Sequence, residues 1–213
     1  MKEIVLEDIR KEFNGDYIFR DLNLEINRNE MIALVGDSGC GKTTLLNLIG
    51  MLDQDYHGTI FIQGKDIKTE NKIGYFRNKL GYLFQNYALI DNKTVSENLD
   101  IALKYVDIRD KKEAKLQALD KVNLAHKLNK KVFTLSGGEQ QRVAIARILL
   151  KQCEIVLADE PTGSLDENNK TYVLHLLKEL QKMGKTILIV THDKEVADFC
   201  DRIVDIQQLK EKG

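Results

Sequence analysis

The sequence has no tryptophan, a single proline and only three cysteines among its 213 residues. Cys40, Cys153 and Cys200 are odd in number, widely spaced and outside any C-x-x-C pattern. This pattern argues against both a disulfide framework and a cysteine-bound zinc ion. The four histidines show no metal-ligand spacing either. We therefore expect reduced thiols and no structural metal.

Long apolar runs and a surplus of one charge are also missing. No run approaches the roughly 20 apolar residues that are needed to cross a bilayer. Acidic residues interrupt positions 1–8, so the beginning of the chain does not resemble a signal peptide. The formal net charge is only -1, which gives no sign of nucleic-acid binding. We expect a cytoplasmic protein without a nucleic-acid partner.

The residues that are present suit an α/β fold. A chain with 43% hydrophobic residues is long enough to bury a full core in one domain. Early apolar alternation predicts an antiparallel sheet, helical spacing at about 95–125 predicts a mostly helical insert, and strands alternate with helices from residue 154 onward. That alternation indicates a parallel sheet covered by helices. Strands are expected at 4–6, 17–26, 31–35, 59–64, 155–158 and 186–190, and helices at 44–49, 139–150, 167–183 and 194–200.

The clearest motif fits the pattern G-x-x-x-x-G-K-[ST] between an expected strand and an expected helix. It reads Gly36-Asp37-Ser38-Gly39-Cys40-Gly41-Lys42-Thr43 and is followed by Thr44. Glycines in such a loop let backbone N–H groups turn toward a phosphate, and the start of the helix adds positive potential. We expect Lys42 to bind the β- and γ-phosphates and the Thr43 hydroxyl to ligate magnesium. The motif predicts an ATP site, in which Cys40 fills a variable position.

Two acidic residues, Asp159 and Glu160, directly follow the expected strand 155–158. Ligands of α/β sheets bind at the carboxyl ends of the strands, so both acids are expected beside the ATP site. We expect Asp159 to hold magnesium through water and Glu160 to act as the general base on the attacking water. His192 follows the next strand and is expected at the same edge, within reach of the γ-phosphate. In this combination, acids that merely cap a strand are the weaker interpretation.

A second glycine motif opens the helix expected at 139–150. It reads Leu135-Ser136-Gly137-Gly138-Glu139-Gln140-Gln141-Arg142. The Ser136 hydroxyl and the amides near Gly137 and Gly138 can form another anion site at the start of a helix. One explanation is that each nucleotide lies between the phosphate loop of one subunit and this motif of another. A plain helix cap explains the residues equally well.

Taken in order, these motifs resemble the nucleotide-binding subunit of an ABC transporter over essentially the whole chain. The resemblance rests on residues 36–43 and 135–142, on Asp159-Glu160-Pro161-Thr162, on Ser164-Leu165-Asp166 and on Thr191-His192-Asp193. It implies the P-loop ABC ATPase fold, with a RecA-like core around a parallel sheet and an N-terminal antiparallel β subdomain. It also implies a single domain over 1–213, with a helical subdomain inserted at roughly 88–150.

The same resemblance assigns further residues to the nucleotide site. Gln85 corresponds to the glutamine that senses magnesium and the membrane partner, and Asp166 belongs to a loop that crosses to the opposite subunit. His192 corresponds to the switch histidine of the family. Phe13 stands where an aromatic ring stacks on adenine; that ring is more often tyrosine, and Tyr17 is the less favoured substitute.

The resemblance also implies partners and a function. It implies a head-to-tail homodimer that closes on ATP and Mg²⁺, and integral membrane permease subunits on separate chains, docked near Gln85, Tyr87, Leu89 and Ile90. The chain would then be peripheral at the inner face of the cell membrane. Residues 44–53 and 135–147 resemble the MacB and LolD branch, and residues 81–90 and 94–99 resemble ATPases assigned to bacteriocin export. The function implied is export of a drug, peptide or lipoprotein; the alternative is a non-transport ABC ATPase, such as an FtsE-like cell-wall regulator or an iron–sulfur scaffold.

Overall fold

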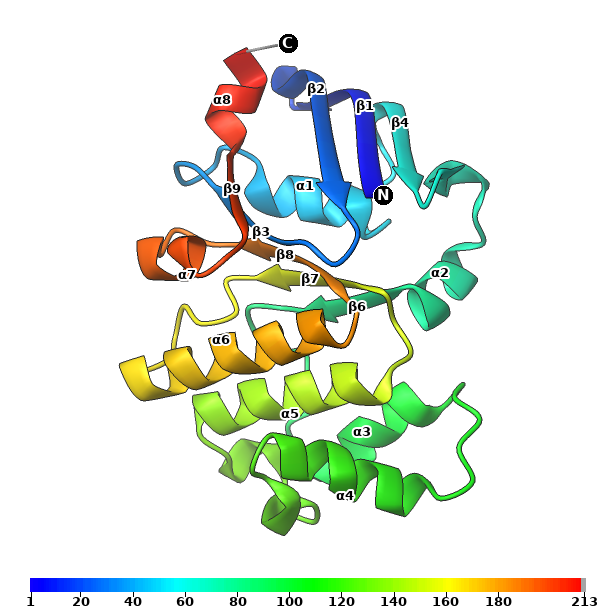
Figure 1. Ribbon diagram of the computed structural model, residues 1–213, viewed down its shortest axis with the longest axis vertical. Coiled ribbons are helices and arrows are strands. Elements are labelled where there is room, and N and C mark those ends of the chain that lie inside the picture. Colours follow the sequence, from blue (N-terminus) through cyan, green and yellow to red (C-terminus); the bar gives the residue numbers. More distant parts are fainter. Residues whose placement is uncertain (212–213) are drawn as a thin grey trace.

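The computed structural model describes residues 1–211, and its elements are stacked in layers (Figure 1). The upper layer in that view is a four-stranded antiparallel sheet in the order β2-β1-β4-β5. Its strands are β1 (Lys2–Phe13), β2 (Asp16–Asn27), β4 (His57–Ile62) and β5 (Lys65–Asp66). β1 and β2 each have buried and exposed residues, and the alternation is most regular in the second half of β2, as expected for a sheet with one face in solvent.

A five-stranded parallel sheet in the order β6-β7-β8-β3-β9 forms the centre of the molecule. Its strands are β3 (Met31–Val35), β6 (Leu80–Leu83), β7 (Ile155–Asp159), β8 (Thr186–Val190) and β9 (Arg202–Asp205). β3, β6, β7 and β8 are almost entirely buried, which explains their continuous apolar runs in the sequence. Because the strands are parallel, Asp159 and Val190 end at one edge of the sheet and pair in register.

Helices cover both faces of the parallel sheet. α1 (Lys42–Ile49) lies between the two sheets, and α5 (Gly137–Leu150) and α6 (Glu167–Lys182) lie on the opposite face (Figure 1). α3 (Val95–Leu103) and α4 (Lys111–Lys121) pack beyond α5. The remaining helices are α2 (Lys72–Asn78), α7 (Lys194–Asp198) and α8 (Ile206–Glu211), with short 3-10 turns η1 (Ile67–Thr69), η2 (Ala125–Lys127) and η3 (Val132–Thr134).

Two hydrophobic clusters hold these layers together. The first fills the space between the antiparallel sheet, α1 and one face of the parallel sheet, and the second joins the other face to α3, α4, α5 and α6. Capping boxes begin α3 at Thr94 with Glu97 and α5 at Ser136 with Glu139, so local side chains fix where these helices start. Across residues 1–211, none of the helices is both long and apolar enough to span a bilayer.

The α/β class expected from the sequence is confirmed, and so are the two kinds of sheet. The first strand was expected at 4–6, but β1 runs from residue 2 to 13. Irregular pairing with β2 near Asp8 and Asp21, both at positive φ, shifts the inward-facing side chains out of a regular period of two. The division of the chain into one domain with an insert at roughly 88–150 stays a prediction.

Candidate functional site

A cleft of about 270 Å³ lies at the carboxyl edge of the parallel sheet, beside the start of α1. The side chains that the sequence predicts for nucleotide, metal and catalysis meet here from three separate segments. The predicted residues that line the cleft are Ser38, Gly39, Gly41, Lys42, Thr43, Thr44, Gln85, Asp159 and Glu160. Ile18 also lines it and had no signal in the sequence beyond its place in an apolar strand.

The phosphate loop has a backbone that only glycine adopts without strain. Gly41 has φ 101°, and a Cβ atom there would lie 2.6 Å from Cγ2 of Ile18 and 2.9 Å from Cζ of Phe19. Lys42 Nζ donates hydrogen bonds to the carbonyl oxygens of Gly36 at 2.7 Å and Asp37 at 2.9 Å. α1 begins without a side-chain cap, so the N–H groups of its first turn can serve an anion in the cleft.

Not every residue of the phosphate loop faces the cleft. Cys40 is buried, and its Sγ would lie 2.8 Å from a Cβ atom at Gly36. The Asp37 carboxylate accepts a hydrogen bond of 2.6 Å from Nε2 of Gln207 in α8, a contact between distant segments that the sequence did not suggest. Gly36 and Cys40 therefore shape the loop by packing, and Asp37 by its bond to Gln207; none of the three lines the cleft.

Thr43 and Asp159 bring two oxygen donors together at the floor of the cleft. Thr43 Oγ1 donates to Asp159 Oδ1 at 3.2 Å. Burial raises the pKa of the Asp159 carboxyl, and the hydrogen bond from Thr43 opposes this rise. Hydroxyl and carboxylate oxygens suit Mg²⁺, which proteins often hold with only one or two side chains. The described residues include no larger cluster, of three or more His, Cys, Asp or Glu, that could bind a metal by itself. These donors therefore fit a magnesium ion that takes its remaining ligands from phosphate and water.

We expect the substitution Asp159→Asn to stabilise the protein in the absence of nucleotide at neutral pH. A carboxyl with a raised pKa in the folded state costs free energy when it ionises, and the asparagine avoids this cost. The thermal midpoint should rise by about 2 °C at pH 7. The difference should shrink as the pH falls and vanish below about pH 3, where the carboxyl is protonated in both the folded and the unfolded state. Calorimetry at several pH values measures it, and equal midpoints at pH 7 would contradict the prediction.

Glu160 lines the cleft, and His192, which follows the neighbouring strand β8, does not line it but contacts Glu160. His192 Nδ1 lies 2.7 Å from Glu160 Oε1, and the Glu160 amide donates to the Val190 carbonyl at 3.0 Å. Glu160 has φ 47°, a costly conformation for a residue with a side chain that is often found at functional sites. The side chain of His192 is 74% exposed but that of Glu160 only 14%. This arrangement can hold and orient a water molecule beside a bound phosphate.

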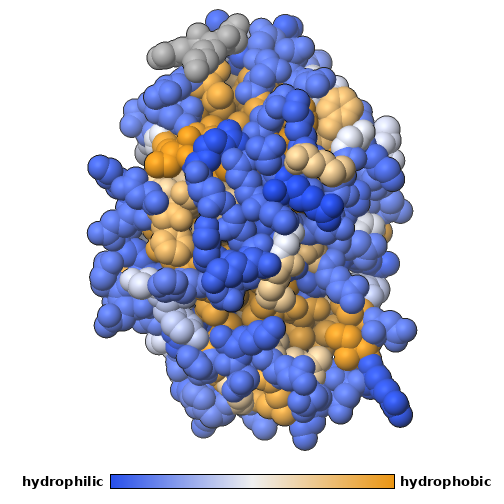
Figure 2. Space-filling model, in the orientation of Figure 1, coloured by the Kyte–Doolittle hydropathy of each residue, from blue (hydrophilic) through white to orange (hydrophobic). Residues whose placement is uncertain are grey.

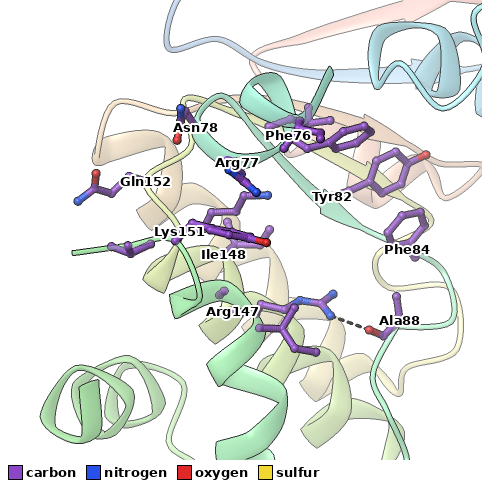
Figure 3. Close-up of a pocket in the computed structure, with 16 residues that line it drawn as sticks. Phe76, Arg77, Asn78, Tyr82, Phe84, Ala88, Arg147, Ile148, Lys151 and Gln152 are labelled. Carbon is purple, nitrogen blue, oxygen red and sulfur yellow. Dashed lines mark hydrogen bonds between the residues drawn. The ribbon is translucent and has the colours of Figure 1, made fainter. Parts of the chain in front are cut away.

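Gln85 follows β6, is exposed, and lies in a segment with a tight backbone turn. Tyr87 and Ala88 have φ 61° and 47°. The Arg147 guanidinium of α5 holds this turn by donating to the carbonyl oxygen of Tyr87 at 2.9 Å and to that of Ala88 at 2.6 Å; Figure 3 shows the second bond. Nothing in the sequence pointed to Arg147, because its two acceptors are backbone atoms about sixty residues away.

The second glycine motif lies outside the cleft of its own chain. Ser136 caps α5, with its hydroxyl accepting the Glu139 amide at 3.3 Å, so the helix-cap interpretation is realised. Gly138 packs so closely against Asn169 that a Cβ atom would lie 2.6 Å from its Cγ. The described residues that line the cleft do not include Ser136, Gly137, Gly138 or Asp166. Their role in nucleotide binding stays a prediction.

The two candidate adenine-stacking rings lie near the turn between β1 and β2. Phe13 is 65% exposed at the end of β1. Tyr17 is 47% exposed and has the guanidinium of Arg20 4.6 Å from the centre of its ring. Neither ring lines the cleft of the described chain, so the assignment of Phe13 stays a prediction.

A second hollow, an apolar groove of about 610 Å³, lies between α2, β6, α3 and α5 (Figure 3). The rings of Tyr82 and Phe84 stack along it, with 4.0 Å between the ring centres. Hydrophobic side chains gather beside α3 at the lower right of Figure 2. Arg77, Arg147 and Lys151 line the groove, and no acidic residue of the described chain does. Arg77 lies 3.5 Å from the centre of the exposed Tyr105 ring. The groove is therefore apolar with a basic rim.

Comparisons with known proteins identify the family of the chain. The family model described as ABC transporter matches residues 19–163. The macrolide export ATP-binding/permease protein MacB of Vibrio parahaemolyticus is 40% identical over 97% of this chain, and MacB of Campylobacter jejuni is 39% identical over 96%. The chain spans about a third (33%) of the length of each of these two relatives.

Solved structures show the same fold. The dimeric ATP-binding cassette MJ0796, in a post-hydrolysis state with bound ADP and Pi, is 34% identical, with a TM-score of 0.84 over 95% of this chain and 93% of that one. The protein cbiO1 of Clostridium perfringens, part of the ABC transporter complex cbiONQ, is 27% identical, with a TM-score of 0.86 over 96% of this chain and 84% of that one.

Proposed function

Because the chain belongs to the ABC transporter family of ATPases, we propose that it hydrolyses ATP with Mg²⁺ to power an exporter. The observation that carries the proposal is the cleft that unites Lys42, Thr43, Asp159 and Glu160. Lys42 and the loop amides bind the phosphates, Thr43 and Asp159 hold magnesium with Gln85 nearby, and Glu160 accepts a proton from water. Magnesium supplies charge neutralisation on the phosphates when it is bound.

The test is steady-state ATP hydrolysis by the purified chain, with and without magnesium. Nucleotide binding is measured in parallel by calorimetry with a non-hydrolysable analogue. Binding in the micromolar to millimolar range and turnover that needs magnesium are the expected results. A chain that binds no nucleotide in either condition would remove the proposal.

The second glycine motif supports a head-to-tail dimer within this proposal. Ser136, Gly137 and Gly138 do not line the cleft of their own chain, which leaves them free to face the cleft of a partner. Asp166 lies close to them because Asn169, which packs on Gly138, donates to its carboxylate at 2.7 Å. The dimeric cassette with bound ADP and Pi is consistent with two chains acting together.

The apolar groove supports a membrane-embedded partner that docks on it. The groove borders the Gln85 segment through Phe84 and Ala88, so an occupant would contact the loop that reaches the cleft. In that segment Tyr87 and Leu89 pack partly against the core, and Ile90 is 47% exposed. Docking at those three residues stays a prediction. Since the rim is basic, the partner segment is an apolar helix that carries at least one acidic side chain.

We expect Ile101→Glu to weaken this docking. Ile101 lies in the groove and is 50% exposed, so the charge should leave the fold intact but place a carboxylate in the apolar contact. The loss in affinity should be at least about tenfold. A photo-crosslinker at Tyr105, used in membranes of the producing organism, should link a polytopic membrane protein, and Ile101→Glu should reduce the yield.

The matched control is Met183→Glu, at an equally exposed apolar residue just after α6. It should leave the cross-linking yield unchanged. The outcome also decides between the proposed exporter and a non-transport ATPase of the same family. If only soluble proteins are linked at Tyr105, the scaffold alternative gains and the transport role is lost while the ATPase assignment stands.

A further inference from the structure

Lys170, in the first turn of α6, ties that helix to the loop that follows β8. Its ammonium nitrogen lies 3.1 Å from a carboxylate oxygen of Asp193 and contacts the carboxylate of Glu195. It also lies 3.1 Å from a carboxylate oxygen of Glu167 in its own helix. The side chain of Lys170 is only 12% exposed, although all three partners are acids near the surface. We call Lys170, Asp193 and Glu195 the α6 clasp.

One member of the α6 clasp, Asp193, directly follows His192 in the chain. The Asp193 carboxylate accepts the Glu195 amide at 2.8 Å with one oxygen and faces Lys170 with the other. The Asp193 amide in turn donates to the Thr191 hydroxyl at 3.0 Å, and Thr191 is fully buried. His192 is thus held between an anchored residue on each side, and its ring points to Glu160.

The other side of the same helical turn is fixed as well. Asn169 accepts a hydrogen bond of 2.6 Å from Arg142 of α5 and donates to Asp166. Gly138, at the start of α5, packs directly on Asn169. Two consecutive residues of α6 therefore connect the second glycine motif to the loop that carries His192.

We infer that Lys170 is a positioning residue for hydrolysis, which holds His192 against Glu160 through Asp193. The inference rests on the proposed ATPase function. The carboxylates of Asp193 and Glu195 are 32% and 70% exposed, so solvent weakens their attraction to Lys170, and the clasp should matter through geometry at the cleft more than through global stability. A small displacement of a positioned group can cost turnover without costing substrate binding.

The experiment compares Lys170→Met with Lys178→Met. Lys178 lies on the same helix and pairs with Asp201 at 2.7 Å, but on the segment that leads to β9. Lys170→Met should lower kcat for ATP about tenfold, with KM changed less than about twofold. Lys178→Met should leave both constants within about twofold, and Lys170→Arg, which keeps the charge, should restore most of the turnover.

The route through His192 is tested in a His192→Ala background. If Lys170 acts by holding His192, adding Lys170→Met to His192→Ala should cause no further loss of kcat. A further loss of the same tenfold size would overturn the inference, and so would an equal effect of Lys178→Met.

Hydrogen exchange keeps the inference testable apart from activity. The amides of Asp193 and Glu195 are hydrogen-bonded, so the peptide spanning 191–195 should exchange faster in Lys170→Met than in the wild type or Lys178→Met. Unchanged exchange of the peptide 191–195 in Lys170→Met would overturn the inference that Lys170 holds this loop. If exchange is faster in Lys170→Met but the wild-type chain hydrolyses no ATP, the clasp stands and the proposed function is refuted.

Discussion

Glu160→Gln should lower kcat for ATP hydrolysis by about 10²- to 10⁴-fold, the usual contribution of a general base. The glutamine has nearly the same size and keeps an oxygen that His192 can contact, but it cannot accept a proton from water. The backbone strain at Glu160 is a property of the main chain and should persist. Binding of ATP should therefore stay within a few-fold of the wild type. Rapid quench of a single turnover measures the loss.

The same variant should accumulate the closed dimer. Since slow hydrolysis leaves ATP in place, the nucleotide should keep two chains together, and size-exclusion chromatography with light scattering should detect a dimer. Glu154→Gln is the matched control, because Glu154 is exposed and directly precedes the first residue of β7, whereas Glu160 directly follows the last. Normal turnover by Glu160→Gln, or a monomer at saturating ATP, would remove Glu160 from the role of base.

Lys42→Met should lower turnover at limiting ATP by a different route, weaker nucleotide binding. Lys42 lines the cleft with a cationic side chain, and charge-assisted hydrogen bonds to phosphate are among the strongest polar contacts. The Kd for ATP should rise about 10- to 100-fold. Isothermal titration of the magnesium–ATP complex, with Glu160→Gln as the non-hydrolysing background, measures this change.

Lys182→Met provides the control for loss of a lysine. Lys182 is exposed at the end of α6 and pairs only locally, with Glu179, so its removal should not affect Kd. Unchanged affinity in Lys42→Met would mean that the loop amides and α1 alone bind the phosphates. Together with Glu160→Gln, the result separates binding from chemistry: one variant loses the ligand and the other retains it without turnover.

Structural features formed by residues close together in the chain could be predicted from the sequence. The phosphate loop, its flanking strand and helix, and the acids after β7 follow from local patterns, because glycine conformation, helix caps and buried apolar runs depend on neighbours in sequence. The meeting of Lys42, Asp159 and Glu160 followed from one further rule, that parallel strands end at the same edge of a sheet. The roles of these residues stay predictions until the variants are measured.

Contacts between distant charged residues could not be read in this way. Lys170 belongs to a polar stretch that looks like an ordinary solvated helix face, yet it is mostly buried against acids more than twenty positions away. Arg147 looked like one more basic residue on α5 until the fold placed it under the turn at Ala88. Irregular pairing of β1 likewise hid most of that strand, because a bulge breaks the period on which strand prediction depends.

The sequence by itself determined the α/β class, the family resemblance and the chemical identity of the cleft, since each is written in short motifs whose geometry is local. Only the tertiary structure decided that the second glycine motif lies outside its own cleft, that an apolar groove with a basic rim borders the Gln85 segment, and that Lys170 reaches the loop of His192. These features depend on how the two hydrophobic clusters pack the helices against the sheets. Packing of that kind sums many weak contacts between residues far apart in the chain, and no local pattern records the result.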